Sequence, residues 1–135
     1  MADAGAEIVG ATAQDVFTGA TEALYAVMGL EGWPGSVRRG VSGTIRARAE
    51  DMAGLLVNFL NEILFLLYAE GTLVSRIDFQ EARDDTGFAL VADYSGEQYS
   101  RSVHGVLREI KAVTFFDAEF REEPGGFKAR VIFDV

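Results

Sequence analysis

Hydrophobic and polar residues alternate along this chain with two spacings, one typical of helices and one typical of strands. Between residues 13 and 28 the apolar positions recur every three or four residues, as in an amphipathic helix. The apolar stripe consists of Val16, Phe17, Ala20, Leu24, Val27 and Met28, and the polar side of Gln14, Asp15, Thr18, Thr21, Glu22 and Tyr25. Thr12, followed three positions later by Asp15, is a helix-start signal, and Gly29 is a stop signal. The pattern therefore predicts a helix from about Thr12 to Gly29.

A second helix is predicted from about Asp51 to Glu70, with Gly71 as its stop. It is apolar on nearly every side except for a narrow polar seam of Asn58, Asn61 and Glu62. Such a helix lies between other elements, and its buried amide and carboxylate must find partners there. Because the seam interrupts the apolar run, which falls short of the roughly 20 residues that a membrane span needs, we interpret the segment as a core helix and expect no membrane association.

Alternation with a period of two predicts the strands. The expected strands cover residues 6–11, 41–48, 72–79, 87–94, 111–120 and 126–135. Turn signals stand between them at EGWPGS, RDDTG, SGEQ and EEPGG. Two helices and several strands that do not strictly alternate predict an α+β fold, with the two main helices packed on a mostly antiparallel sheet in a single domain of residues 1–135.

Composition narrows the functional classes. Twelve basic against 21 acidic residues give a formal net charge of -9, which disfavours direct binding to nucleic acid phosphates. The chain has no cysteine, and therefore neither disulfides nor thiolate metal sites. The start MADAGAEIVG lacks the basic and apolar regions of a signal peptide, so we expect a cytoplasmic protein.

The chain ends on Asp134 and Val135, which places a side-chain carboxylate beside the terminal carboxylate. Together with Asp3 these groups could hold a hard divalent cation, calcium or magnesium, through oxygen atoms. Clustered carboxylates repel one another, and a bridging cation removes the repulsion. The alternative is that both ends of the chain are solvated and frayed.

Common enzyme signatures are absent: there is no GxxxxGK[ST] phosphate loop, no GxSxG turn, and a single histidine, His104. Lys111 opens an apolar strand and is either a positioned charge or a solvated side chain. His104 is either a ligand or proton-transfer group, or a solvated loop histidine. A basic patch is formed by Arg38, Arg39, Arg46 and Arg48, which is either a solvated strand face or a docking surface for an acidic partner.

Four stretches, in order, resemble archease proteins over essentially the whole chain. MADAGAEIVGATAQDVF resembles the family's opening, LLVNFLNEILFLLYAEG its leucine-rich helix, HGVLREIKAVTFF its histidine followed by Lys-Ala-Val-Thr, and FKARVIFDV its ending. The residues that carry the match in the first two stretches are Ala2, Asp3, Gly5, Gly10, Thr12, Phe17, Leu60, Asn61 and Glu62. Phe116 stands where the family commonly has histidine.

The resemblance implies a cofactor protein of the tRNA-splicing ligase RtcB, one that promotes guanylylation and turnover of the ligase and broadens its nucleotide use without being an enzyme itself. It implies calcium, magnesium or another divalent cation at Asp3, Asp134 and Val135, and a functional lysine at Lys111, with His104 a second candidate for activation. Involvement with tRNA would be indirect.

Two alternative functions remain. One is a general chaperone or adaptor that binds through apolar surface. The other is a metal-dependent hydrolase, for which the chain shows no obvious general base near the site.

Overall fold

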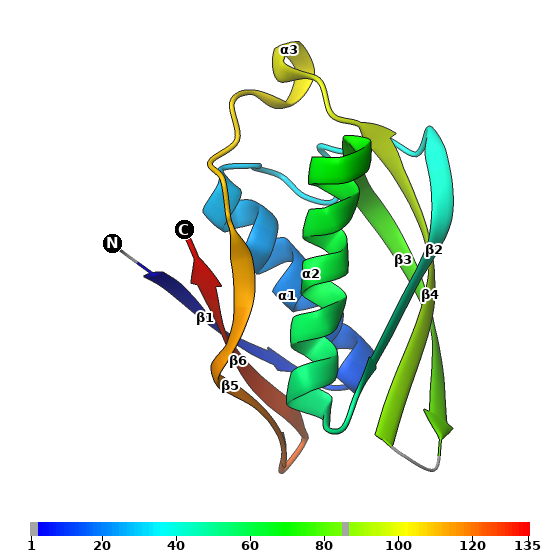
Figure 1. Ribbon diagram of the computed structural model, residues 1–135, viewed down its shortest axis with the longest axis vertical. Helices are drawn as coiled ribbons and strands as arrows, with labels where there is room; N and C mark the ends of the chain where they lie inside the picture. Colours follow the sequence, from blue (N-terminus) through cyan, green and yellow to red (C-terminus); the bar gives the residue numbers. More distant parts are fainter. Residues whose placement is uncertain (1–2, 85–86) are drawn as a thin grey trace.

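The computed structural model describes residues 3–84 and 87–135, which form six strands and three helices (Figure 1). In chain order these are β1 (Asp3–Gly10), α1 (Ala13–Met28), β2 (Val41–Ala49), α2 (Met52–Glu70), β3 (Thr72–Asp84), β4 (Gly87–Gln98), α3 (Arg101–His104), β5 (Ala112–Glu123) and β6 (Gly126–Asp134). The α+β prediction is confirmed.

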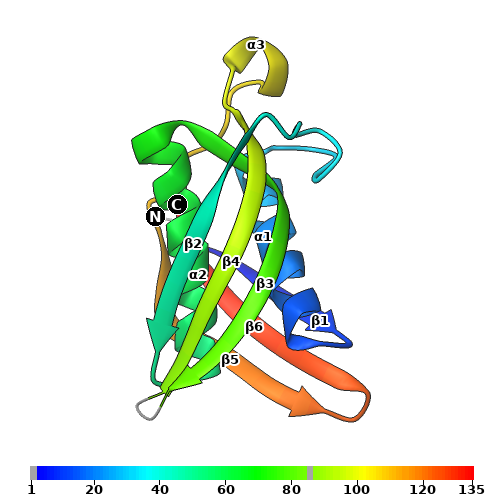
Figure 2. The ribbon, with the colours of Figure 1, turned by 90° about the vertical axis from the view of Figure 1, so that its right-hand side faces the viewer.

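The strands form two antiparallel sheets of three strands each, in the orders β1-β6-β5 and β2-β4-β3. Helix α2 lies between them and contacts β5 of one sheet and β2 of the other, while α1 packs on β1 and β6 (Figures 1 and 2). A single sheet was expected from the sequence. Because the order and register of strands depend on tertiary packing, the alternation along each strand does not reveal the division into two sheets.

The limits of α1 follow from its end residues. The Thr12 hydroxyl accepts a hydrogen bond from the Asp15 N–H at 3.1 Å, and the Asp15 carboxylate accepts one from the Thr12 N–H at 3.3 Å. Gly29 ends the helix in the left-handed conformation, with φ 92°, which glycine adopts without steric cost. The predicted start and end of this helix are confirmed.

The predicted polar side of α1 is wrong at two positions, since Thr21 and Tyr25 are both fully buried. The Tyr25 hydroxyl accepts a hydrogen bond from the Val74 N–H at 2.9 Å, and the Thr21 hydroxyl donates to the Phe17 carbonyl at 2.9 Å. Burial raises the pKa of the Tyr25 phenol far above its ordinary value, more than the hydrogen bond lowers it. The helix is therefore buried on a second side, and each polar group there has a partner.

Helix α2 is a core helix, as predicted, although its length and composition alone would allow it to cross a membrane. Nine of its residues are buried between the sheets, Phe59 and Leu60 completely. Burying side chains of this size contributes about 2 kcal/mol each, so α2 supplies much of the stability of the core. Asp51 caps its start by accepting from the Gly54 N–H at 2.7 Å, and Gly71 ends it.

The turn predicted at SGEQ is wrong, because residues 95–98 continue β4. Residues 95 and 96 pair with both neighbouring strands, and residues 97 and 98 pair with β3. Glycine is needed here for close packing: any side chain on Gly96 would collide with the carbonyl oxygen of Leu73. The turn at EEPGG is confirmed between β5 and β6. Of the turn predicted at RDDTG, residues 85 and 86 lie outside the described residues, and the short helix α3 was not predicted.

Candidate functional site

The pairing of β1 with β6 brings the start and the end of the described chain together. In this antiparallel pair Asp3 lies directly opposite Asp134, and on the other side of β6 Asp134 lies opposite Ala112 (Figure 1). Directly opposed residues have Cβ atoms about 5 Å apart, and like charges at such positions destabilise the pair. The two carboxylates of the predicted cation site are therefore cross-strand neighbours at the end of the sheet.

The chemistry of these donors fits a hard divalent cation. Asp3 is exposed and Asp134 half-buried, so solvent reaches both, and the terminal carboxylate of Val135 follows directly. In the described part of the chain no three His, Cys, Asp or Glu side chains form a metal-binding group. Asp3 and Asp134 supply carboxylate oxygens, and oxygen-only donors of this kind suit calcium or magnesium.

Lys111 lies at the same end of the sheet. Its N–H donates to the Asp134 carbonyl at 2.7 Å, which fixes its backbone beside the two carboxylates. Strand alternation places Ala112 on the face of Asp3 and Asp134, so the preceding lysine side chain starts from the other face. The side chain is exposed, and no ion pair joins it to another described residue.

Helix α2 holds the segment that carries Lys111. The Tyr68 hydroxyl donates to the Ile110 carbonyl at 2.8 Å and accepts from the Ile110 N–H at 2.9 Å. The Asn61 amide does the same for Val113, donating to its carbonyl and accepting from its N–H, both at 2.9 Å. We call these four hydrogen bonds, from Tyr68 to Ile110 and from Asn61 to Val113, the α2 clamp. They fix the backbone on both sides of Lys111 and Ala112.

The polar seam of α2 is explained by this arrangement, although only in part. Asn61 serves the edge of the first sheet, and the Asn58 amide donates to the Arg48 carbonyl of the second sheet at 2.6 Å. The prediction that the amide of Asn61 finds a partner is confirmed. Glu62, expected to be buried, is exposed, because α2 turns that position away from both sheets.

The phenol of Tyr68 carries its proton at physiological pH, as the clamp requires, because the ordinary pKa of tyrosine is about 10 and the surroundings raise it. Desolvation raises its pKa, the hydrogen bond to Ile110 lowers it, and the negative charge of Glu109 raises it further. The net shift is upward, so the hydroxyl keeps its proton and can donate to the Ile110 carbonyl at physiological pH. Sequence reasoning missed Tyr68; the available signal was its spacing of seven residues from Asn61, two helical turns along one face.

His104 is not a solvated loop histidine. It ends α3, its side chain is completely buried, and its ring stacks on Tyr99 with centroids 5.8 Å apart. Its Nε2 lies 2.7 Å from the Glu97 carboxylate, and its Nδ1 accepts from the Ser100 N–H at 3.0 Å, an arrangement that suits the tautomer with the proton on Nε2. These contacts give the ring a structural role.

The position of α3 separates His104 from the two carboxylates. The helix lies at the top of the molecule in Figure 1, beyond the ends of the sheets, whereas Asp3 and Asp134 lie at the ends of β1 and β6. The hydrogen bond from His104 is also the main reason that the pKa of Glu97 is lowered, followed by the hydrogen bond from the Arg38 N–H. The structure therefore does not bring His104 into the cation site.

The four arginines of the predicted basic patch are all exposed. Arg46 and Arg48 alternate with the buried Ile45 and Ala47 on β2, as expected for the solvent face of a strand. This favours the interpretation of the patch as a solvated strand face.

Comparisons with known proteins agree over the whole chain. The sequence pattern of the Archease protein family matches residues 1–135. The chain is 32% identical to the protein archease of Methanosarcina mazei over 128 residues, covering 93% of this chain and 85% of the relative. It is 33% identical to the protein archease of Methanothermobacter thermautotrophicus over 134 residues, covering 99% and 93%.

A solved structure shows the same fold. The solution structure of protein 1598 from Methanobacterium thermoautotrophicum matches with a TM-score of 0.80 at 31% identity, covering all of this chain and 94% of that one. The family pattern spans the full length, and the relatives exceed 30% identity over nearly all of it. The chain therefore belongs to the archease protein family.

Proposed function

We propose that this chain is a cytoplasmic protein cofactor of the tRNA-splicing ligase RtcB, which promotes guanylylation and multiple turnover of the ligase and is not itself an enzyme. Family membership supports this activity, and one structural observation supports its location. The opposed carboxylates of Asp3 and Asp134 lie at the same end of a sheet as the exposed side chain of Lys111, which starts from the other face and forms no ion pair with another described residue. Its contact with tRNA would be indirect, through the ligase.

Each residue has a separate role in this proposal. Asp3, Asp134 and the terminal carboxylate of Val135 would hold a calcium or magnesium ion, which supplies a fixed positive charge at the end of the sheet. Lys111 presents a second positive charge from the neighbouring face to the ligase or its nucleotide phosphates. The α2 clamp keeps the lysine backbone in place, so that the charge is oriented before the partner binds.

A ligation assay tests the activity. Purified RtcB-type ligase from the same cell is given excess RNA ends, and the joined product per ligase molecule is followed with and without this protein. We expect the intact chain to sustain many turnovers, Lys111→Ala to fall toward the unassisted level, and Lys111→Arg to recover part of the difference. The control Lys128→Ala, which removes a half-buried lysine on β6 that pairs with Glu7, should behave as the parent. A parent protein that does not raise turnover would refute the proposal.

The cation is tested separately from activity. Titration calorimetry with calcium, and thermal unfolding with and without it, are measured for the parent, Asp3→Asn and Asp134→Asn. Removing either opposed carboxylate should weaken binding, yet stabilise the metal-free protein by roughly 0.2–1 kcal/mol because one like-charge pair is gone. Glu22→Gln, which removes an exposed carboxylate on α1, away from both sheet ends, serves as control. Equal calcium binding by all four proteins would place the ion elsewhere.

A further inference from the structure

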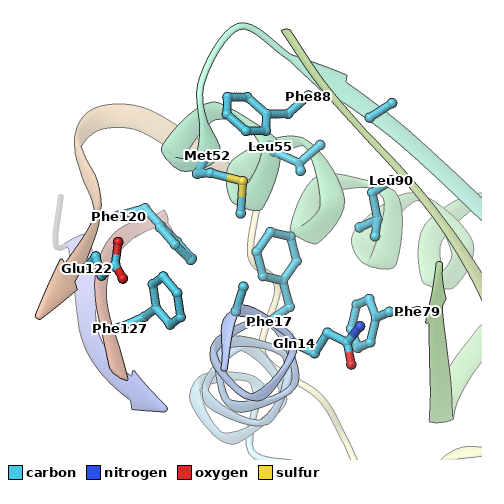
Figure 3. A pocket seen from close by; sticks show the side chains of 12 residues that line it. Gln14, Phe17, Met52, Leu55, Phe79, Phe88, Leu90, Phe120, Glu122 and Phe127 are labelled. Carbon is cyan, nitrogen blue, oxygen red and sulfur yellow. The ribbon is translucent and has the colours of Figure 1, made fainter. Parts of the chain in front are cut away.

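An apolar cavity of about 360 Å³ lies at the other end of the β5–β6 hairpin from the candidate cation site. Figure 3 shows it between the starts of both long helices and the two sheets: Phe17 and Gln14 come from α1, Met52 and Leu55 from α2, Phe120 and Glu122 from β5, and Phe79, Phe88 and Leu90 from the second sheet. Phe127, which also lines it, is seven residues from Asp134 along β6, a distance of about 23 Å in a strand. The two sites are therefore separate.

Five phenylalanine rings form most of the wall of this cavity. The ring centroids of Phe17 lie 6.0 Å from Phe79 and 6.1 Å from Phe120, at interplanar angles of 81° and 63°, and Phe120 lies 5.6 Å from Phe127. These are edge-to-face and tilted contacts. Because the rings pack against one another, they form a rigid wall of the cavity. A ring that turns its face to the cavity offers negative π density, which attracts a cation.

The polar groups of the lining are few and carry one sign of charge. Glu122 is exposed, and in Figure 3 its carboxylate turns toward Phe120 and Phe127 at the side of the cavity. It forms no hydrogen bond or ion pair with another described residue. Gln14 is the other polar side chain, and the described lining contains no lysine or arginine. An apolar body with a positively charged end would match both the rings and the carboxylate.

We propose that this cavity binds a small organic amine with an aromatic or branched aliphatic body. The cavity volume sets the size of the ligand. At about 30 Å³ for each water-sized group, a cavity of about 360 Å³ holds roughly a dozen non-hydrogen atoms. The body contacts the phenylalanine rings, and the ammonium group faces Glu122 at the mouth, where the ring faces and the carboxylate attract it together. This site is independent of the proposed activation of the ligase.

The probe series separates the apolar from the charged contribution. Phenylbutylamine, phenylbutanol and phenylbutyrate share one body of about the right size and carry a positive, a neutral and a negative end. By calorimetry against the intact chain at low salt, we expect the amine to bind roughly fivefold to tenfold more tightly than the alcohol, and the carboxylate most weakly. The advantage of the amine should shrink as salt is added, since Glu122 is exposed to solvent.

Variants locate the site and identify its charge. Glu122→Gln should bring the amine to the affinity of the alcohol, whereas Glu119→Gln on the same strand should change nothing. Met52→Trp fills the cavity and should abolish binding of all three probes, while Phe65→Trp, on the exposed side of the same helix, should not. Ala13→Leu fills the cavity from α1 and replaces Met52→Trp if that variant does not fold, as judged by thermal unfolding. Equal affinities for the three probes, no binding at all, or binding that survives filling of the cavity would overturn the proposal.

Discussion

Replacing Asn61 by aspartate tests the α2 clamp, because the change replaces the amide nitrogen by oxygen and so removes one hydrogen bond. The amide of Asn61 now donates to the Val113 carbonyl and accepts from the Val113 N–H, both at 2.9 Å. A carboxylate can still accept from the N–H, but it places an oxygen against the carbonyl oxygen. Val113 is 3% exposed, so its backbone groups have little access to water as a substitute.

The expected loss in the free energy of unfolding follows from these contacts. Asn61→Ala leaves one donor and one acceptor of Val113 without a partner, at about 1–3 kcal/mol each when fully buried. Because Asn61 is half-buried and β5 is a sheet edge, we expect the lower part of the range, about 2 kcal/mol in total, or a fall in Tm of roughly 6–10 °C. Asn61→Asp should be about 1 kcal/mol less stable than Asn61→Ala at pH 7, because a carboxylate oxygen then faces the Val113 carbonyl oxygen.

The pH dependence distinguishes this mechanism from a simple loss of packing. The introduced carboxyl faces a carbonyl, which raises its pKa in the folded state above the unfolded value of about 3.9. The folded state then holds the proton more tightly, so the penalty is full at neutral pH and is relieved as the pH falls through the raised pKa. Chemical denaturation of the parent, Asn61→Ala and Asn61→Asp at pH 7 and pH 4.5 measures this, with Asn58→Ala, expected to cost about 1 kcal/mol, as the control. If Asn61→Asp is as stable as Asn61→Ala at pH 7 and does not gain relative to it at pH 4.5, the clamp is misassigned.

Three further changes test other parts of the structure. Tyr68→Phe removes both hydrogen bonds to Ile110 and should cost about 1–2 kcal/mol in denaturation, and it should also reduce ligase activation because the Lys111 segment loosens. His104→Phe should return the pKa of Glu97 toward its ordinary value of 4.5, as measured by NMR titration. In the parent protein this pKa is lowered, so the contact contributes its full stability above pH 4.5 and loses it as the pH falls through the lowered pKa. An unchanged titration would show that the contact does not form. Phe59→Ala should destabilise the core by about 3–5 kcal/mol, and a loss below about 1 kcal/mol would contradict its complete burial.

The parts of the fold that depend on neighbouring residues were predictable from the sequence. Thr12 and Asp15 cap the start of α1 within one turn, and Gly29 ends it through its own backbone, so these signals need no tertiary information. Tyr25 was misplaced because its hydroxyl bonds to Val74, 49 residues away, in a strand whose position no local pattern gives. The turn at residues 95–98 failed for the same reason, since a glycine that serves close packing looks like a turn glycine.

Some residues of the candidate site could be predicted from the sequence and others could not. Asp3, Asp134 and Lys111 could be named from the chain ends and from the resemblance to archeases, and the register of β1 with β6 places the two carboxylates opposite each other. Asn61 could be named as a seam residue that needs a partner, but its partner could not, and Tyr68 was missed. Both side chains bond to backbone atoms of a distant segment, and backbone acceptors have no sequence signature. The aromatic cavity was also missed, since its rings come from both helices and both sheets.

The most direct test of the proposed function is the rate at which the ligase forms its guanylate intermediate. The rate is measured in a single turnover with matched concentrations of the parent, Lys111→Ala, Asp3→Ala and the control Lys128→Ala. Lys111 is exposed, so Lys111→Ala should stay within about 0.5 kcal/mol of the parent in stability, and a lower rate would reflect lost charge. We predict that Lys128→Ala accelerates guanylylation as the parent does, and that Lys111→Ala and Asp3→Ala leave it near the unassisted rate. Full acceleration by both variants would contradict the assignment of activation to this end of the sheet.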